Sequence, residues 1–252
     1  MADDVDVLAK WGWGVTSEFF KKPLYLQVRD AVAQLVLNER WKPGTPLPNE
    51  TDLSREFGVS AGTMRKALDL LESEHLLTSQ QGRGTFVADQ SSAELAIRFS
   101  NVRAPDGSRI SGEISTSSIL EGKATDNEAY SLELGQGDPV YRIRRVRTYP
   151  GRPYMLEQAT VPAALFPDLP SRRDTSHRMV MIARDYRILL GAAQERVSAA
   201  PASFEAGKVL GIRPGTPITV LDRLVRTVDS VPVEWRVSEC HLGDLQYMAD
   251  MN

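Results

Sequence analysis

Two short stretches of the chain carry side chains whose types and spacing suit contact with nucleic acid. Residues 60–66 begin with small side chains and end in Arg65 and Lys66. Small residues at the start of a helix let its backbone approach base edges, and long cations reach guanines or phosphates. Residues 81–84 place Arg83 between two glycines, which favours the tip of a tight turn. These residues predict binding to double-stranded DNA.

The residues predicted to contact DNA lie on two successive helices and on the turn that follows them. They are Thr51, Arg55, Ser60, Ala61, Gly62, Thr63, Arg65, Lys66, Gln81, Gly82, Arg83 and Gly84. Arg55 and Lys66 have a simpler alternative role, because an exposed cation on a helix is most often a solvated surface charge. The formal net charge of −3 excludes a generally polycationic nucleic-acid coat and leaves localised recognition.

Two helices joined by a tight turn are predicted around these residues. Asn49 can cap the first helix, and Gly58 lies where the chain must leave it with positive φ. Ser60 then caps a second helix, whose apolar residues recur at i, i+3, i+4 and i+7. This apolar stripe consists of Met64, Ala67, Leu68 and Leu71. The opposite face is the one expected to meet DNA.

A leading helix and a two-stranded wing complete the predicted domain. The periodic apolar stretch after Pro23 predicts a packing helix, and the prolines of residues 41–48 predict a loop after it. Leu76–Ser79 and Thr85–Ala88 are strand candidates on either side of the glycine-rich turn. The wing would carry Arg83 at its tip.

Residues 23–88 resemble the winged helix-turn-helix of the GntR family of bacterial transcription regulators. The matching positions are Pro23-Leu24-Tyr25, Pro43-Gly44, Leu47-Pro48, Glu50, Leu53, Phe57-Gly58-Val59-Ser60, Thr63, Arg65, Ala67-Leu68, Leu71 and Gly82-Arg83-Gly84-Thr85-Phe86-Val87. Thr51 and Ala61 depart from the pattern, since many members have Arg at both positions. The resemblance therefore predicts DNA binding without predicting the operator sequence.

The resemblance also implies how this domain meets its partner. Thr63 and Arg65 would contact DNA from the recognition helix, while Gly82 and Arg83 would enter the minor groove from the wing. We expect a homodimer that binds operator DNA with an inverted repeat, because the symmetry of a dimer is matched by two half-sites.

The remainder of the chain predicts a second domain of α+β structure. Its strand candidates are Ile110–Leu120, Val140–Thr148, Tyr154–Val161, Ile218–Val228 and Val231–Cys240. Its helix candidates are Asp126–Leu134, Ser176–Leu190 and Ala202–Leu210. Strand pairs mixed with helices favour an antiparallel sheet in an α+β domain. The chain is thus divided into an N-terminal arm at 1–17, the winged helix-turn-helix domain at 18–88, a linker at 89–94 and the second domain at 95–252. The Trp11 to Gly14 stretch of the arm is assigned no role.

The second domain contains an internal repeat of helix, turn and hairpin. Leu134-Gly135 followed by Pro139 recurs as Leu210-Gly211 followed by Pro217, and the two prolines are 78 positions apart. Two such halves can pack with their sheets facing and leave a cleft between them, a common location for a small ligand.

Residues 95–248 resemble the UTRA effector-binding domain of the HutC branch of the GntR family, a domain similar in fold to chorismate lyase. The matching positions are Leu134-Gly135, Gly137, Pro139-Val140, Arg145, Arg147, Pro153, Glu157, Pro162, Leu210-Gly211-Ile212, Gly215, Pro217, Arg223, Pro232-Val233-Glu234 and Gly243-Asp244. The resemblance implies that this domain binds a small-molecule effector.

Five residues are implied as the effector site by this resemblance. They are Arg145, Arg147, Glu157, Ser176 and Glu234. Arg145 and Arg147 share a face of their strand because strand side chains alternate, and the arginine fork suits a phosphate or a carboxylate. Ser176 would lie at a helix start, where backbone amides favour anions. The alternative role of both arginines is a structural ion pair with Glu157 or Glu234.

Two other functions remain open at this point. The first is an enzyme of chorismate lyase-like fold, and the second is an architectural DNA-binding dimer that needs no effector. Three histidines and the single Cys240 offer no spacing typical of a metal site or an activated nucleophile, so no cofactor or metal is predicted. Cys240 also cannot form an internal disulfide, and no apolar run approaches about 20 residues. With an acidic start that is no signal peptide, a soluble cytoplasmic protein without membrane contact is expected.

Overall fold

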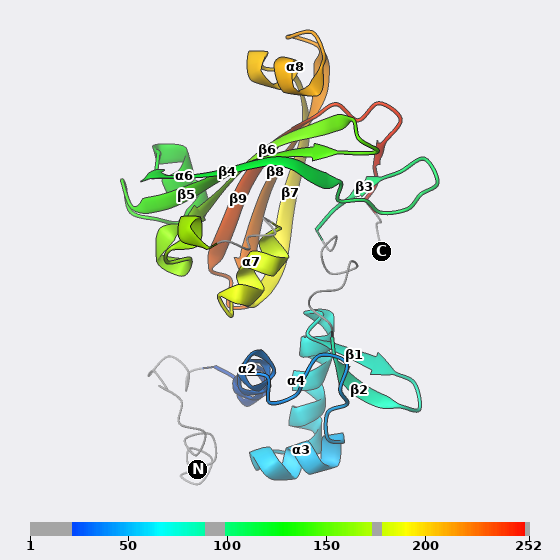
Figure 1. Ribbon diagram of the computed structural model, residues 1–252. Coiled ribbons are helices and arrows are strands. Elements are labelled where there is room, and N and C mark those ends of the chain that lie inside the picture. Colours follow the sequence, from blue (N-terminus) through cyan, green and yellow to red (C-terminus); the bar gives the residue numbers. More distant parts are fainter. Residues whose placement is uncertain (1–21, 89–98, 173–177, 250–252) are drawn as a thin grey trace. The chain divides into compact units, whose positions relative to one another are not determined.

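The computed structural model describes residues 22–88, 99–172 and 178–249 (Figure 1). The chain divides into two compact units, residues 1–92 and 93–252. The expected arm and linker lie outside the described residues. Within the described residues, no helix is both long enough and apolar enough to cross a bilayer.

The described residues of the N-terminal unit form three helices and a two-stranded wing. Its elements are α2 (Leu24–Leu37), α3 (Glu50–Phe57), α4 (Ala61–Ser73), β1 (Leu77–Gln80) and β2 (Gly84–Val87). The Asn49 side chain accepts a hydrogen bond from the Asp52 amide at 2.9 Å, and the Ser60 side chain accepts one from the Thr63 amide at 3.1 Å. Gly58 ends α3 with φ of 64°. Both predicted caps and the predicted turn are therefore confirmed.

Apolar side chains from all three helices fill the core of this unit. Val32, Leu53, Phe57, Met64 and Leu71 are each at most 1% exposed. The periodicity of α4 is the reason, since residues three and four apart lie on one face of a helix. Leu68 is only half-buried, at the margin of the predicted stripe. The opposite face of α4 stays in solvent.

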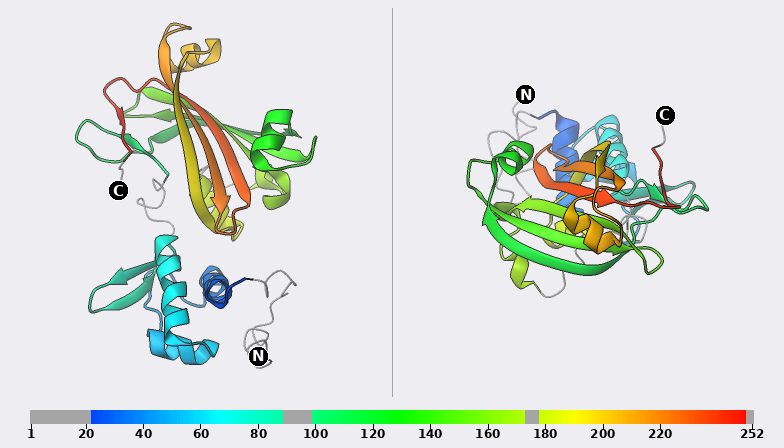
Figure 2. Two further views of the ribbon diagram at one scale, coloured as in Figure 1. Left: turned by 180° about the vertical axis from the view of Figure 1, so that it is seen from behind. Right: turned by 90° about the horizontal axis from the view of Figure 1, so that it is seen from above.

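The C-terminal unit is built on a six-stranded antiparallel sheet with strand order β4-β5-β6-β9-β8-β7 (Figures 1 and 2). The strands are β4 (Glu113–Lys123), β5 (Pro139–Thr148), β6 (Pro153–Pro162), β7 (Leu190–Pro201), β8 (Pro217–Thr227) and β9 (Pro232–Cys240). The short strands β3 (Val102–Arg103) and β10 (Gln246–Tyr247) pair separately. The observed mixture of helices with an antiparallel sheet confirms the predicted α+β class.

The two halves of the internal repeat join edge to edge within this sheet. Strands β6 and β9 pair antiparallel from Met155 opposite Cys240 to Thr160 opposite Trp235. The suggestion that the halves could pack as two facing sheets is therefore wrong. The physical reason is the burial of β6, because a buried strand with an unpaired edge would leave backbone groups without hydrogen bonds.

Among the described residues, three short α-helices pack on the sheet. They are α6 (Asp126–Leu132), α7 (Met179–Asp185) and α8 (Phe204–Leu210). Met179 and Ile182 of α7 pack into the cluster that includes Ile143 and Val225 of the sheet. Helix α8 packs instead on Leu156 of β6. Adjacent side chains of a strand point to opposite faces of the sheet, and Leu156 points to the face that α7 does not cover. The sheet thus has α7 on one face and α8 on the other.

One prediction in this unit placed a helix where a strand begins. A helix was predicted over Ser176–Leu190, but α7 ends at Asp185, and Leu190 starts the twelve-residue strand β7. The first two residues of the predicted helix, 176 and 177, lie outside the described residues. The strand was missed because its sequence, rich in alanine with Gln, Glu and Arg, favours helix locally. Pairing with β8 outweighs that preference.

Candidate functional site

All twelve residues predicted to contact DNA lie in the described part of the N-terminal unit. Eleven of them are exposed, and Thr63 is half-buried beneath the cap that its amide makes with Ser60. Those on α4 occupy its first turns, on the side away from the buried Met64 and Ala67. Their contact with DNA stays a prediction, and their solvent exposure is compatible with it.

The two cations of the recognition helix are held by neighbouring side chains. Arg65 donates to Glu50 through Nε at 3.1 Å and through Nη2 at 3.0 Å. The Glu50 carboxylate raises the pKa of Arg65, first through this hydrogen bond and then through its charge. Lys66 Nζ lies 3.8 Å from the centre of the Tyr25 ring. Both cations are therefore oriented before any ligand arrives, while their outer surfaces remain accessible.

The wing presents Arg83 on a turn that depends on glycine. Gly82 and Gly84 have φ of 72° and 108°, a region that disfavours residues with a side chain. The turn is closed by a hydrogen bond from the Arg83 amide to the Gln80 carbonyl at 2.9 Å. The exposed Arg83 side chain projects from this turn, as the sequence predicted.

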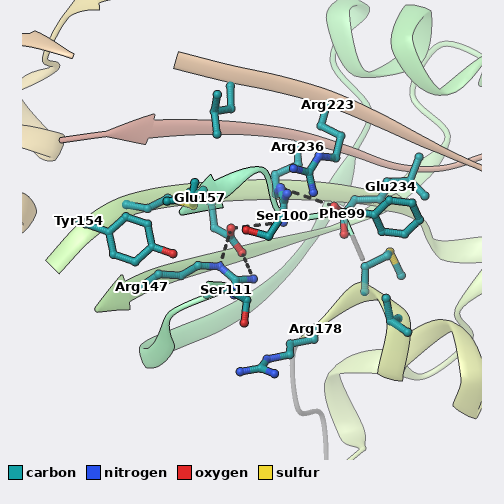
Figure 3. A pocket seen from close by; sticks show the side chains of 16 residues that line it. Phe99, Ser100, Ser111, Arg147, Tyr154, Glu157, Arg178, Arg223, Glu234 and Arg236 are labelled. Atoms are coloured by element: carbon teal, nitrogen blue, oxygen red, sulfur yellow. Dashed lines mark hydrogen bonds and ion pairs between the residues drawn. The ribbon is translucent and has the colours of Figure 1, made fainter. Parts of the chain in front are cut away.

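A polar pocket lies against the sheet of the C-terminal unit, on the side covered by α7 (Figure 3). It encloses about 540 Å³ of empty space, part of it open to solvent. Its charged lining consists of Arg147, Glu157, Arg178, Arg223, Glu234 and Arg236. The rest of the wall is mainly apolar, with side chains such as Met155, Leu221 and Val225.

Glu157 is the centre of the charged network in this pocket. Its carboxylate accepts hydrogen bonds from Arg145 at 2.8 Å and from Arg147 at 2.9 and 3.1 Å. Arg236 Nη1 lies 3.4 Å from the same carboxylate. Burial alone would raise the pKa of Glu157, but the three guanidiniums, led by Arg147, hold that pKa well below its usual range. Glu157 is therefore a buried anion that fixes three cations.

The five residues predicted for the effector site divide into three groups. Arg147, Glu157 and Glu234 line the pocket, as Figure 3 shows. Arg145 is fully buried beside Glu157 and is not among the lining residues, so a role through Glu157 fits its position better than ligand contact. Ser176 lies outside the described residues. The sequence alternative of an ion pair with Glu157 is realised by both arginines.

Three further arginines of the pocket were not predicted as site residues. Arg178 precedes α7, and Arg223 and Arg236 lie directly opposite each other on β8 and β9. Arg223 pairs with Glu195 of β7 at 2.5 Å, and Glu195 also accepts a hydrogen bond from Tyr247. A sequence signal existed for Arg236, because it follows Glu234 by two residues and must share its face of the strand.

The surroundings of the single cysteine do not suit a nucleophile. Cys240 is fully buried, and burial raises the pKa of its thiol, which is opposite to the activation that a nucleophilic cysteine requires. Within the described residues, no group of three or more His, Cys, Asp or Glu side chains could hold a metal ion.

Comparison with known proteins identifies both units. The family of bacterial regulatory proteins named gntR matches residues 24–87, and the UTRA domain family matches residues 113–244. This chain belongs to the GntR family, in the group that carries a UTRA domain. It is 30% identical to an HTH-type transcriptional regulator of Mycobacterium tuberculosis over 84% of this chain and 80% of the relative.

Other GntR relatives and structures agree with this assignment. The mannosyl-D-glycerate transport/metabolism system repressor MngR of Escherichia coli is 29% identical over 78% of this chain and 82% of its own length. The histidine utilization repressor of Pseudomonas putida is 28% identical over 80% of this chain and 81% of its own length. The crystal structure of PhnF from Mycobacterium smegmatis aligns with a TM-score of 0.51 and 25% identity, over 89% of this chain and 99% of that one. The chain is thus a transcription regulator of the GntR and UTRA type, like its relatives.

Proposed function

We propose that this GntR protein is a repressor whose affinity for operator DNA changes when a small anionic metabolite binds in the pocket of the UTRA domain. The protein would act as a homodimer on an inverted repeat, with one winged helix at each half-site. The observation that carries the proposal is the excess of buried arginine around a pocket, in a unit separate from the exposed recognition helix.

The two units supply complementary parts of this function. The exposed start of α4 and the Arg83 turn offer cations and backbone to a DNA groove. Arg147 and its neighbours offer guanidinium groups to an acid, in a pocket where a charged hydrogen bond is stronger than in water. The dimer would have one arrangement that binds operator DNA well and another that binds it poorly. An effector that binds these two arrangements with different affinities would shift operator affinity by up to the ratio of those two affinities.

A gel-shift titration tests the proposal. Full-length protein is titrated against the DNA upstream of its own gene and against a scrambled fragment, with and without a panel of phosphorylated sugars and organic acids. We expect preferential binding to the upstream DNA and release by at least one acid. Arg178→Gln should bind the DNA like wild type but respond less to that acid, because Arg178 lines the pocket and is absent from the DNA-binding unit. Equal affinity for both fragments would refute a specific regulator.

A further inference from the structure

We propose that the ligand of this pocket carries two separate acidic groups, one held by Arg147 and Arg178 and the other by Arg223 and Arg236. This inference rests on the proposed function and specifies the chemistry of its effector. Figure 3 shows Arg223 and Arg236 together in the upper part of the pocket, with Arg147 and Arg178 below them. The ligand would span these two ends with a short, mainly apolar spacer.

The charges around the pocket do not cancel. Five guanidiniums belong to the network, those of Arg145, Arg147, Arg178, Arg223 and Arg236. Three carboxylates face them among the described residues, those of Glu157, Glu195 and Glu234. Two positive charges are left over. Because an uncompensated charge in a buried site is costly, this excess matches a ligand with two negative charges.

The upper end contains two like charges placed side by side. Arg223 and Arg236 are cross-strand partners on β8 and β9, and their side chains are only 6% and 11% exposed. Like charges directly opposite each other destabilise a sheet. Burial lowers the pKa of Arg223, and the charge of Arg236 lowers it further. Burial acts to lower the pKa of Arg236 as well, but Glu157, Glu234 and Glu195 raise it, so carboxylates already offset part of the repulsion. An acid placed between the two guanidiniums would offset the rest.

Arg236 is also incompletely bonded. Its Nε is buried and makes no hydrogen bond within the described residues, and its ion pairs to Glu157 and Glu234 span 3.4 and 3.7 Å. Donors of a guanidinium prefer acceptor distances below about 3 Å. Arg236 therefore has donor capacity left for a ligand acid at this end.

The lower end contains the cation with the fewest partners. Among the described residues, Arg178 has no carboxylate partner, and its one hydrogen bond is a long contact of 3.4 Å to the Gly112 carbonyl. Within the described residues, Arg147 nearby uses three of its five N–H donors on Glu157 and the Ser111 carbonyl, so it adds positive potential and has two donors left for an acid. Burial lowers the pKa of Arg178, and Arg147 lowers it further. A second acidic group at this end would supply the missing acceptor.

Among the described residues, unused donors lie at both ends of the pocket, on Arg236 at the upper end and on Arg178 at the lower end, which distinguishes a diacid from a phosphate monoester. A single phosphate would engage one pair of arginines and leave the donors of the other pair unused. The lining includes Met155, Leu221 and Val225, which offer no hydrogen bonds, beside the hydroxyls of Ser100, Ser111 and Tyr154. A spacer that lies against the apolar side chains should carry few hydroxyls, because hydroxyl groups buried there lose their bonds to water.

Calorimetric titration of the full-length protein tests this inference with defined probes. The diacids are succinate, glutarate, adipate and 3-phosphoglycerate. Each dicarboxylate is matched by its monoamide, which keeps the size and removes one charge, and glucose 6-phosphate supplies two charges at one end. We expect one of the diacids to bind about tenfold or more tightly than its one-ended counterpart, since one lost charge-assisted contact corresponds to at least that factor.

Two variants locate the ends. In Arg236→Gln and in Arg178→Gln, the preferred diacid should bind no better than its monoamide, because only one end remains. Arg144→Gln is the matched control, since Arg144 pairs with Glu205 of α8 and lies on the opposite face from Arg145. It should keep the wild-type preference. Circular dichroism checks that each variant folds. If Arg236→Gln fails to fold, Arg178→Gln carries the test, because among the described residues Arg178 has a single weak hydrogen bond to lose.

Three results would overturn the inference. In the first, glucose 6-phosphate binds as tightly as the best diacid. In the second, each diacid and its monoamide bind equally well. In the third, no diacid binds at 10 mM, a concentration on the order of a weak ligand's dissociation constant. Release of operator DNA by glucose 6-phosphate would retain the proposed regulator and overturn only the two-ended ligand. Failure to bind the upstream DNA would instead refute the regulator, whatever the pocket binds.

Discussion

The predicted DNA-binding surface and the pocket of this protein both contain arginine paired with glutamate, but in opposite environments. The Arg65 and Glu50 side chains are 68% and 30% exposed, whereas Arg145 and Glu157 are both fully buried. An exposed pair contributes little to folding and exchanges partners easily. A buried pair is costly to break, because the remaining charge has no water to solvate it. The exposed Arg65 can therefore exchange Glu50 for DNA at little cost, whereas the buried Arg145 forms part of the fold behind the pocket.

The largest effect is expected from removing the anion at the centre of the buried network. Glu157→Gln leaves Arg145, Arg147 and Arg236 without their shared carboxylate. The free energy of unfolding of the C-terminal unit should fall by about 3–5 kcal/mol. Urea denaturation followed by circular dichroism measures the change. Glu205→Gln breaks the exposed pair with Arg144 and should cost less than about 1 kcal/mol. Similar losses in the two variants would erase the distinction between buried and exposed pairs.

On the DNA-binding surface, truncating an arginine should affect affinity and leave stability unchanged. Arg65→Ala removes a predicted contact from the exposed start of α4, so binding to the upstream DNA should weaken about five- to a hundredfold. Arg65→Lys keeps the charge and loses the planar fork, so it should retain binding to scrambled DNA while losing preference for the operator. Gel shifts at fixed salt measure both affinities, with Arg144→Ala as a charge-matched control. If Arg65→Ala bound the upstream DNA as tightly as wild type, Arg65 would not be part of the DNA interface.

The partly buried pair of Glu128 and Arg142 lies on the face of the sheet opposite the pocket and is an intermediate case. Glu128 accepts hydrogen bonds from Arg142, at 2.7 and 2.6 Å, and from Thr160 at 3.0 Å. Burial opposes ionisation, but these bonds and those from Thr125 lower the pKa of Glu128 to about 2. Glu128→Gln should therefore cost about 1–3 kcal/mol at neutral pH.

The pH dependence of this loss follows from the direction of the pKa shift. A carboxylate with a depressed pKa stabilises the fold fully above its ordinary pKa of 4.5, and this contribution is lost as the pH falls toward 2. The difference in melting temperature between wild type and Glu128→Gln should shrink over that range. Glu133→Gln, which breaks the more exposed pair with Arg226, should show a smaller difference throughout. A difference that stays constant down to pH 2 would contradict the assigned role of Glu128.

The sequence predicted local features of this fold better than long-range ones. The caps at Asn49 and Ser60 depend on neighbours within three residues, and both formed as predicted. The strand β7 and the joining of β6 to β9 depend on partners far along the chain, and neither was predicted. In the pocket, alternation placed Arg145 and Arg147 on one face, but only the register of β8 with β9 brings Arg223 opposite Arg236. Strand register is set by tertiary packing, which residue spacing does not encode.

The smallest expected effect concerns the carboxylate that holds Arg65. Glu50→Gln removes a negative charge beside the predicted DNA surface and releases the two hydrogen bonds that orient the guanidinium. Binding to scrambled DNA should therefore strengthen about two- to fivefold, because one repulsion of the phosphates is gone, while the preference for the upstream DNA should decline. Glu56→Gln is the control, since it removes a charge of the same unit that pairs with Arg40, which is not among the predicted DNA contacts. If Glu56→Gln and Glu50→Gln lowered the preference equally, the orientation of Arg65 would have no part in specificity, and the exposed pair would act on DNA by net charge alone.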